Sequence, residues 1–178
     1  MLIKAFPKAK SAGFTLIELM IALMVLVVLV GMGFPSFLQM LRNAEIRAAA
    51  ESVANGLQRA RAEAVSRNVK VQFILGAGTS WRVDLVPAAE PPIDSRESSE
   101  GSANTSISSS LAADSTAATT ITFNQLGQIV PNADASKSLA QVNFVAPGGS
   151  QGLRVTIGAG GNARVCDPSY SAPHPRAC

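Results

Sequence analysis

A long uncharged stretch near the N-terminus is the feature that most restricts how this chain folds. From Phe14 to Phe34 the only ionisable side chain is Glu18. Helical residues rise about 1.5 Å each, so roughly 20 of them cross the hydrocarbon core of a bilayer. Residues 14–34 are therefore predicted to form a transmembrane helix. Basic residues and no acid precede the stretch, and because basic residues stay on the cytoplasmic side, everything after the helix is expected outside the cytoplasm.

Glu18 is out of place in a membrane helix. A carboxylate there costs about 2.5 to 3.5 kcal/mol on insertion scales, so it should have a partner, and the helix itself offers none. Cleavage between Gly13 and Phe14 would give Phe14 a cationic amine. Glu18 of a neighbouring copy would then pair with this amine and set the register between stacked helices. The alternative is a glutamate that reaches the membrane interface near the helix end.

The order of these features resembles the class III signal of type IV pilins and pseudopilins: a basic leader ending in Gly13, then Phe14-Thr15-Leu16-Ile17-Glu18, then an apolar helix. The resemblance implies that a prepilin peptidase removes the leader, residues 1–13, and that the Phe14 amine is methylated. It also implies a single-pass inner-membrane protein whose helix later packs against other pilins in a filament core.

Pro35 closes the apolar run and matches a proline that pilins carry at this place. With Glu18, it is the second residue assigned to assembly. Proline removes a helical hydrogen bond. A bend or local unwinding is therefore expected near Gly31, Gly33 and Pro35.

The charge of the chain is less informative than its formal value of +3 indicates. Three lysines, Lys4, Lys8 and Lys10, lie in the leader, so 15 − 3 leaves 12 basic side chains against 12 acidic ones. Overall charge therefore does not indicate a nucleic-acid partner. The remainder, residues 35–178, has the length of one globular domain and is expected in the periplasm.

Residues 35–68 are predicted to form an amphipathic helix that continues the membrane helix. Apolar residues recur there at spacings of three and four, on one face that should pack on a sheet. Opposite them, Arg59, Glu63 and Arg67 are spaced for ion pairs. Asn55-Gly56 is a weak point, since Gly costs about 1 kcal/mol relative to Ala in a helix. The residues of the apolar face are Ile46, Ala49, Ala50, Val53, Leu57, Ala60 and Ala64.

From Val69 the apolar period changes to two, which predicts short antiparallel strands with one buried side in residues 69–178. The segment of about 87–119 is rich in Ser, Ala, Thr and acidic residues, and is predicted to be a long mobile loop. The fold class is thus α+β. The resemblance to type IV pilins implies a pilin fold, with a long N-terminal helix, half transmembrane and half amphipathic, packed on an antiparallel sheet. The alternating stretches lie around 69–73, 81–85, 120–123, 142–144 and 153–157.

Cys166 and Cys178 are the two cysteines of the chain. In an oxidising compartment they are expected to form a disulfide around a C-terminal loop, worth about 3 kcal/mol on the chain-entropy model. With a single His, His174, no metal site is predicted, and no cofactor. No catalytic arrangement is found, and the run 158–161, Gly-Ala-Gly-Gly, is interpreted as a turn. The protein is therefore predicted not to be an enzyme.

Most of the chain, except the Ser-rich segment, shows a second resemblance, to the FimT/GspH branch of the pilin superfamily. It rests on residues 57–71, on Phe123-Asn124-Gln125-Leu126-Gly127-Gln128, and on the two segments around the cysteines, 164–168 and 176–178. Some FimT-like pilins bind DNA through a C-terminal Gly-Arg-x-Arg motif. Here Gly161-Asn162-Ala163-Arg164 keeps only the last arginine.

The C-terminal end is nevertheless locally basic. Arg164 and Arg176, with His174 and a Tyr170 that would stack on a base, are the candidate residues for double-stranded DNA. The alternative is a disulfide-closed loop that contacts neighbouring subunits.

Together these patterns predict a minor type IV pilin, FimT/GspH-like, incorporated into a pilus or its initiating tip complex, with a basic C-terminal loop that would aid DNA uptake. Two alternatives stay open. One is a type II secretion pseudopilin, and the other is a DNA-binding receptor pilin for natural transformation.

Overall fold

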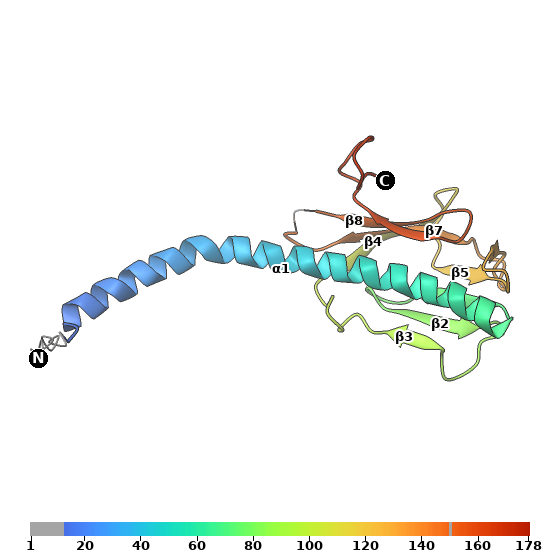
Figure 1. Cartoon of the computed structure of the whole chain (residues 1–178), viewed down its shortest axis with the longest axis horizontal. Coiled ribbons are helices and arrows are strands. Elements are labelled where there is room, and N and C mark those ends of the chain that lie inside the picture. The colour runs from blue at the N-terminus through green and yellow to red at the C-terminus, as the bar shows by residue number, and fades with distance from the viewer. Residues whose placement is uncertain (1–12, 150) are drawn as a thin grey trace, which may run out of the picture. The chain divides into compact units, whose positions relative to one another are not determined.

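The computed structural model describes residues 13–149 and 151–178 (Figure 1). The predicted leader lies almost wholly outside these ranges. The chain divides into two compact units, Met1–Leu38 and Gln39–Cys178. One helix, α1 (Leu16–Arg67), contributes residues to both.

The first unit contains the N-terminal part of α1, where every described residue up to Phe37 is exposed. The best 18-residue window of α1 has a mean hydropathy of 2.7 and no buried residue. Among the described residues, α1 is the helix long and apolar enough to cross a membrane. Helix is continuous through Gly31, Gly33 and Pro35, so the local unwinding is not observed, and the bend stays a prediction.

The second unit combines the rest of α1 with two antiparallel sheets. One has five strands in the order β3-β2-β1-β5-β6, and the other has four in the order β4-β7-β8-β9. In the view of Figure 1, β2 and β3 are drawn on one side of α1, and β4, β7 and β8 on the other. The strands are β1 (Val71–Leu75), β2 (Trp81–Leu85), β3 (Asp94–Arg96), β4 (Ser106–Ala112), β5 (Thr120–Phe123), β6 (Ile129–Val130), β7 (Leu139–Val145), β8 (Leu153–Ile157) and β9 (Ala163–Cys166).

A single hydrophobic core joins α1 to both sheets. All seven residues predicted for the apolar face of the helix are buried, because their spacing places them on the side that meets the strands. Four of them are alanines, which let the helix approach the strands closely. Gly56 is buried as well, and a Cβ at this position would lie 2.8 Å from Cε2 of Phe73 and 3.1 Å from the ring of Trp81. Gly56, predicted to weaken the helix, thus lets the helix lie close to the rings of Phe73 and Trp81.

The loop predicted at about 87–119 is wrong in one respect, because two strands, β3 and β4, lie within it. β4 pairs with β7 from Ser106↔Val145 to Ala112↔Leu139. Its sequence, Ser-Ile-Ser-Ser-Ser-Leu-Ala, has few large apolar residues, so the alternation of its side chains does not predict a strand. Backbone pairing with β7 forms the strand instead. The expected single sheet is correspondingly two.

Polar contacts also hold this segment against α1. Arg59 Nε lies 3.7 Å from Asp94 Oδ2, and Asn104 Nδ2 donates to Glu45 Oε1 at 3.1 Å. Arg96 donates to the carbonyl of Ala48 at 3.4 Å. Three residues of the segment, Asp94, Arg96 and Asn104, therefore contact α1 at three different positions along it.

Candidate functional site

The N-terminal end of α1 is the first candidate. Residues 13–15 precede the helix, so the Gly13–Phe14 bond predicted to be cleaved lies outside it. Thr15 caps α1: its hydroxyl accepts a hydrogen bond from the Glu18 backbone N–H at 3.3 Å. Glu18 itself lies in the first helical turn.

The contact uses the Glu18 backbone, so the expectation that the helix offers the carboxylate no partner stays a prediction, although the first turn is a favourable place for an acid. Carboxylates are stabilised near a helix N-terminus by about 0.3 to 1 kcal/mol through the macrodipole. The gain offsets only part of the 2.5 to 3.5 kcal/mol cost of a membrane acid. Most of the requirement for an external cation therefore remains. The Thr15-x-x-Glu18 spacing of a capping box was the sequence signal for this contact.

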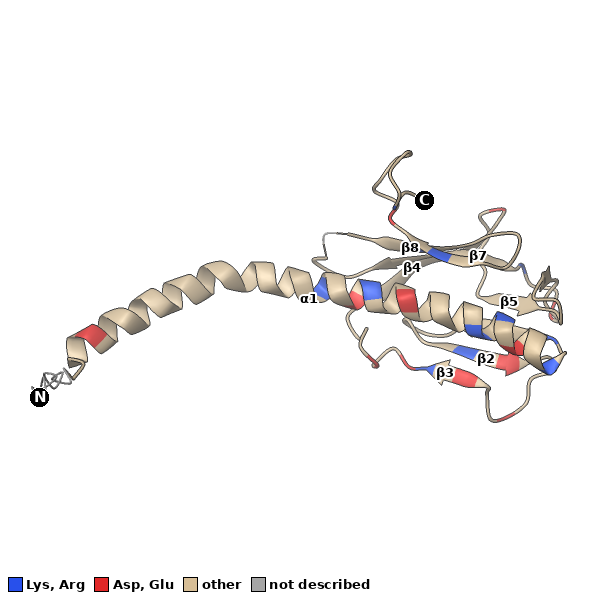
Figure 2. Cartoon of the chain, in the orientation of Figure 1, with Lys and Arg blue, Asp and Glu red and all other residues tan. Residues whose placement is uncertain are grey.

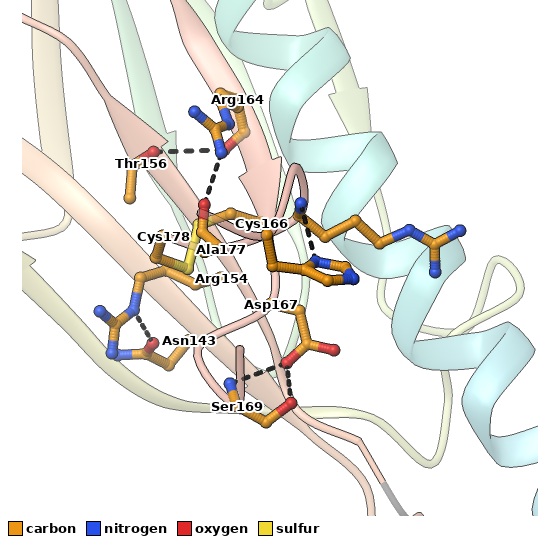
Figure 3. Close-up of a disulfide and its surroundings, with 11 residues drawn as sticks. Asn143, Arg154, Thr156, Arg164, Cys166, Asp167, Ser169, Ala177 and Cys178 are labelled. Atoms are coloured by element: carbon orange, nitrogen blue, oxygen red, sulfur yellow. Dashed lines mark hydrogen bonds between the residues drawn. A yellow bond between two sulfur atoms is a disulfide. The ribbon is translucent and has the colours of Figure 1, made fainter. Parts of the chain in front are cut away.

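The C-terminal loop is the second candidate (Figure 3). The predicted disulfide between Cys166 and Cys178 is present, with a Cα–Cα distance of 5.2 Å. Beside it, the backbone N–H of Asp167 donates to the Arg176 carbonyl at 2.8 Å. The disulfide and this hydrogen bond fasten the end of the loop to the end of β9.

Arg164 also holds this loop. Its guanidinium donates to the carbonyl of Ala177 (Figure 3), although the residue is exposed. The side chain predicted to contact DNA thus has a positioning contact inside the protein.

The other three residues predicted to contact DNA have contacts apart from those of Arg164: Tyr170 and His174 contact each other, and Arg176 lies at a groove. The rings of Tyr170 and His174 stack on each other, with centroids 3.9 Å apart and an interplanar angle of 11°. One face of Tyr170 is therefore already covered. His174 Nδ1 accepts the backbone N–H of Arg176 at 3.1 Å, whereas the Arg176 side chain lines a groove beside α1.

A polar surface on the four-stranded sheet was missed in the sequence. Because Leu153, Val155 and Ile157 pack toward the core, alternation places the intervening residues of β8 on the opposite face. There Arg154 Nε donates to Asn143 Oδ1 at 2.6 Å, and Asn143 Nδ2 to Ser109 Oγ at 2.6 Å. The strand pairing of Arg154 with Asn143 could not be read from a single strand.

The groove beside α1 has a volume of about 380 Å³. Arg47 and Glu51 line it from the helix, and Asp167 and Arg176 from the C-terminal side. Asp167 is buried and its Oδ1 accepts hydrogen bonds from the Ser169 N–H and hydroxyl, at 2.9 and 2.5 Å. Two cations and two carboxylates therefore meet around one opening.

A buried carboxyl lies elsewhere, on β2. Burial raises the pKa of Asp84 above its ordinary value; Arg82 opposes this shift, and Glu90 adds to it. Arg82 Nε lies 2.9 Å from Asp84 Oδ2. In the described part of the chain, no group of three or more His, Cys, Asp or Glu residues is arranged to hold a metal ion.

Comparison with known proteins identifies two family models. One, described as type II transport protein GspH, matches residues 49–167, and one described as a prokaryotic N-terminal methylation motif matches residues 8–34. No curated protein sequence matches the chain.

Two crystal structures of the type IV minor pilin FimU from Pseudomonas aeruginosa are similar to it. One shares 18% identity and covers 71% of this chain and 97% of its own, with a TM-score of 0.46. The other shares 19% identity and covers 72% and 93%, with a TM-score of 0.49.

Proposed function

The chain belongs to the family of the type II transport protein GspH, and from this premise we propose that it is a minor type IV pilin. It would be incorporated through its N-terminal helix into a pilus or its initiating tip complex. Members of this family are structural pilins or pseudopilins, and the apolar part of α1 fits a membrane-anchored component of such a fibre.

One observation carries the proposal. The first unit presents an apolar helix without a buried residue, and its single acid follows closely after a bond outside the helix. In the membrane, lipid covers the apolar surface of this helix, and in a fibre other pilin helices would replace the lipid. The amine that a prepilin peptidase would release at Phe14 supplies the cation that Glu18 lacks.

The N-terminus tests the processing step. We expect mass spectrometry of the membrane-extracted protein to find a chain that begins at Phe14 with a methylated amine. The Glu18→Ala variant should be made, processed and retained in the membrane, but should be lost from sheared fibres. Glu90→Ala, which removes an acid that is 80% exposed at its side chain, is the matched control and should be incorporated normally. A chain that starts elsewhere, or normal incorporation of Glu18→Ala, would contradict the proposal.

The description of the matched family favours a second candidate, a pseudopilin of a type II secretion system. The architecture is the same and the machine differs. Deletion of the gene separates the two: loss of surface pili with intact protein secretion indicates a pilus subunit, and the reverse indicates a secretion subunit.

DNA uptake stays a proposal for the C-terminal end. It is supported by Arg154 and Arg164, which share the outer face of the four-stranded sheet with Gln141, Asn143 and Thr156 and with no carboxylate on these strands. Phosphate contacts of this kind weaken steeply with salt. A gel shift with double-stranded DNA tests the site. The double variant Arg164→Ala, Arg176→Ala should bind DNA more weakly than the wild type. Equal binding by the variant and the wild type would rule out this DNA site.

A further inference from the structure

We propose that the free edge of β9 is a docking site for an extended segment of a different protein, which adds a strand to the four-stranded sheet. Three features of the second unit carry this inference. They are outward-facing backbone groups at Ala163 and Val165, an apolar groove at the first of these residues and a charged groove at the second. The inference goes beyond the proposed function, because it concerns the second unit alone.

The hydrogen bonds of the β8–β9 hairpin show which backbone groups of β9 face outward. In an antiparallel pair, residues that exchange hydrogen bonds with the partner strand alternate with residues that do not. The Gly158 N–H donates to the Asn162 carbonyl at 3.0 Å where the hairpin begins, so the next residue of β9, Ala163, is not bonded to β8. By the same alternation, neither is Val165. The N–H and C=O groups of both residues therefore point toward the free edge.

The next residue with this orientation already has a strand partner. The Asp167 N–H donates to the Arg176 carbonyl at 2.8 Å, and Asp167 and Ala177 form a parallel bridge. The C-terminal segment of the chain thus adds to the edge of β9 at this point. Among the described residues, none pairs with the outward groups of Ala163 or Val165. The edge therefore accepts a strand at one end and is open along the rest.

The other three sheet edges are protected in ways that are usual for natural proteins. β3 and β6, which end the five-stranded sheet, have only three and two residues. β4, at the opposite edge from β9, contains register shifts. Its last residue is also covered, since the Ala112 N–H donates to the Thr116 carbonyl at 2.8 Å. From Ala163 to Val165, β9 has no comparable cover.

An apolar groove lies at the first open residue, Ala163. Ala62 and Val65 line it from α1, and Leu126 lines it from the turn between β5 and β6. This Leu126 groove has a volume of about 570 Å³. Leu126 is 74% exposed, more than any other large apolar side chain described after residue 41, and Val65 is 51% exposed. Burying these side chains under an apolar partner residue would stabilise a complex.

The exposure of Leu126 belongs to an ordered turn. Asn124 Oδ1 accepts the Leu126 N–H at 3.0 Å, and Arg61 Nε donates to the Gly127 carbonyl at 2.9 Å. The turn is thus closed on itself and fastened to α1. Leu126 is therefore held in place at the groove before any partner arrives.

The groove beside α1, described above, lies at the second open residue, Val165. Arg47 and Glu51 line it from the helix, and Arg176 lines it from the C-terminal segment. All three of these residues are exposed. Because charges of both signs surround the opening, it suits a polar side chain better than an apolar one.

The two grooves define the side-chain pattern of the partner. Residues that lie opposite one another on neighbouring strands share a face of the sheet, and Ala163 and Val165 pack toward the core, on the side of α1. In Figure 3, the strand that carries Arg164 and Cys166 runs beside this helix. The open residues are two apart, which is about 6.6 Å along a strand. The partner therefore has an apolar and a polar residue two positions apart.

A second copy of this chain does not fit the edge well. If two β9 edges paired antiparallel, with Ala163 opposite Val165, each Arg164 would lie opposite the other. Like charges directly opposite one another destabilise a strand pair. Arg154 adds a further positive charge on the same face. The row of backbone donors and acceptors still requires a polypeptide, so the partner is an extended segment of a different protein.

Selection from a phage-displayed library of random short peptides, with the full-length chain in detergent as the target, tests the site. Enriched peptides should carry an apolar residue two positions from a polar one. A synthetic copy of an enriched peptide should bind Leu126→Ser several-fold more weakly than the wild type. Val145→Ser, which removes an exposed apolar side chain outside both grooves, is the matched control and should bind like the wild type. No enrichment, or equal weakening in the two variants, would overturn the proposal.

Backbone methylation of the same peptide gives a measurement that does not depend on the folding of a variant. In strand pairing, alternate amides of the peptide face β9 and the others face solvent. Methylating one alternate set should abolish binding, and methylating the other set should leave it nearly unchanged. Equal effects of the two sets would show that the peptide does not add as a strand. Dimers of the full-length chain that dissociate when the peptide is added would show that a second copy fills the edge, and would overturn the choice of partner.

Discussion

The two parts of α1 show how one helix can depend on two different surroundings. In the first unit it has no buried residue, whereas in the second it buries nine, from Ile46 to Ala64. Figure 2 shows the same division in charge, since basic and acidic residues gather on the second part of the helix and on the strands. The second part is stabilised by the chain's own sheets. The first exposes apolar side chains along its length, so we expect lipid or other subunits to cover it, in line with the proposed assembly.

The largest expected effect comes from placing the same acid in both parts. Val53 is 0% exposed and Val27 is 69% exposed. Val53→Asp buries an unpaired carboxylate, which should cost several kcal/mol and unfold the globular unit. Val27→Asp should leave the melting temperature unchanged and instead reduce membrane insertion, at about 2.5 to 3.5 kcal/mol. Fluorescence of Trp81, the only tryptophan, reports thermal unfolding of the detergent-solubilised chain. Equal losses in the two variants would show that the comparison is wrong.

The disulfide should be next in size. Replacing Cys166 and Cys178 by serine opens a loop of sequence separation 12. This loss should lower the free energy of unfolding by about 3 kcal/mol on the chain-entropy model, because the unfolded chain gains freedom. Urea denaturation of the second unit measures the change. A decrease well below 1 kcal/mol would mean that the remaining contacts of Arg164 and Asp167 already hold the loop.

Gly56 distinguishes helix propensity from packing. Propensity alone predicts that Gly56→Ala stabilises the helix by about 1 kcal/mol. The contacts of its Cβ with Phe73 and Trp81 predict instead a net loss, since overpacking a core costs about 1 to 3 kcal/mol. Gly33→Ala is the matched control, because its Cβ position has nothing within 4 Å apart from its chain neighbours and the helix's own backbone, and it should not lower the stability of the globular unit. A stabilised Gly56→Ala variant would show that Phe73 and Trp81 move enough to accommodate the added methyl group.

The smallest effect concerns charge inside the globular unit. Because burial raises the pKa of Asp84, the folded state holds this proton more tightly than the unfolded state. The contribution to stability is therefore present below the ordinary pKa of 3.8 and is lost as the pH rises through the folded value. Asp84→Asn should thus be more stable than the wild type at neutral pH, by less than about 1 kcal/mol, with the difference vanishing in acid.

Asp134→Asn is the control of opposite sign. Hydrogen bonds from the Ser136 side chain and backbone lower the pKa of Asp134, so its contribution is present above the ordinary pKa and is lost as the pH falls through the folded value. Denaturation curves at several pH values compare the two variants. Parallel pH profiles would contradict the assignment of Asp84 as a destabilised carboxylate.

Local patterns in the sequence were sufficient for the helix and for several strands. The seven apolar positions from Ile46 to Ala64 are buried as their spacing predicts, and the alternation at 153–157 coincides with β8. The run of small residues at 158–161 is the turn between β8 and β9, with the Gly161 N–H donating to the Gly158 carbonyl at 2.8 Å. The helix face, the strand and the turn each depend on residues that are close in the chain, so the sequence pattern alone predicts them.

By itself the sequence determined the exposed apolar helix, the acid in its first turn and the pair of cysteines, because hydropathy, charge and thiol chemistry belong to single residues or short runs. Only the tertiary structure decided that the Ser-rich segment supplies β4 and that Gly56 lies against Phe73. It likewise decided that Arg164 holds Ala177 and that Arg47 and Glu51 border an open groove. Each of these features brings together segments that are separate in the chain, and it exists only once the strands have paired and the helix has packed on them.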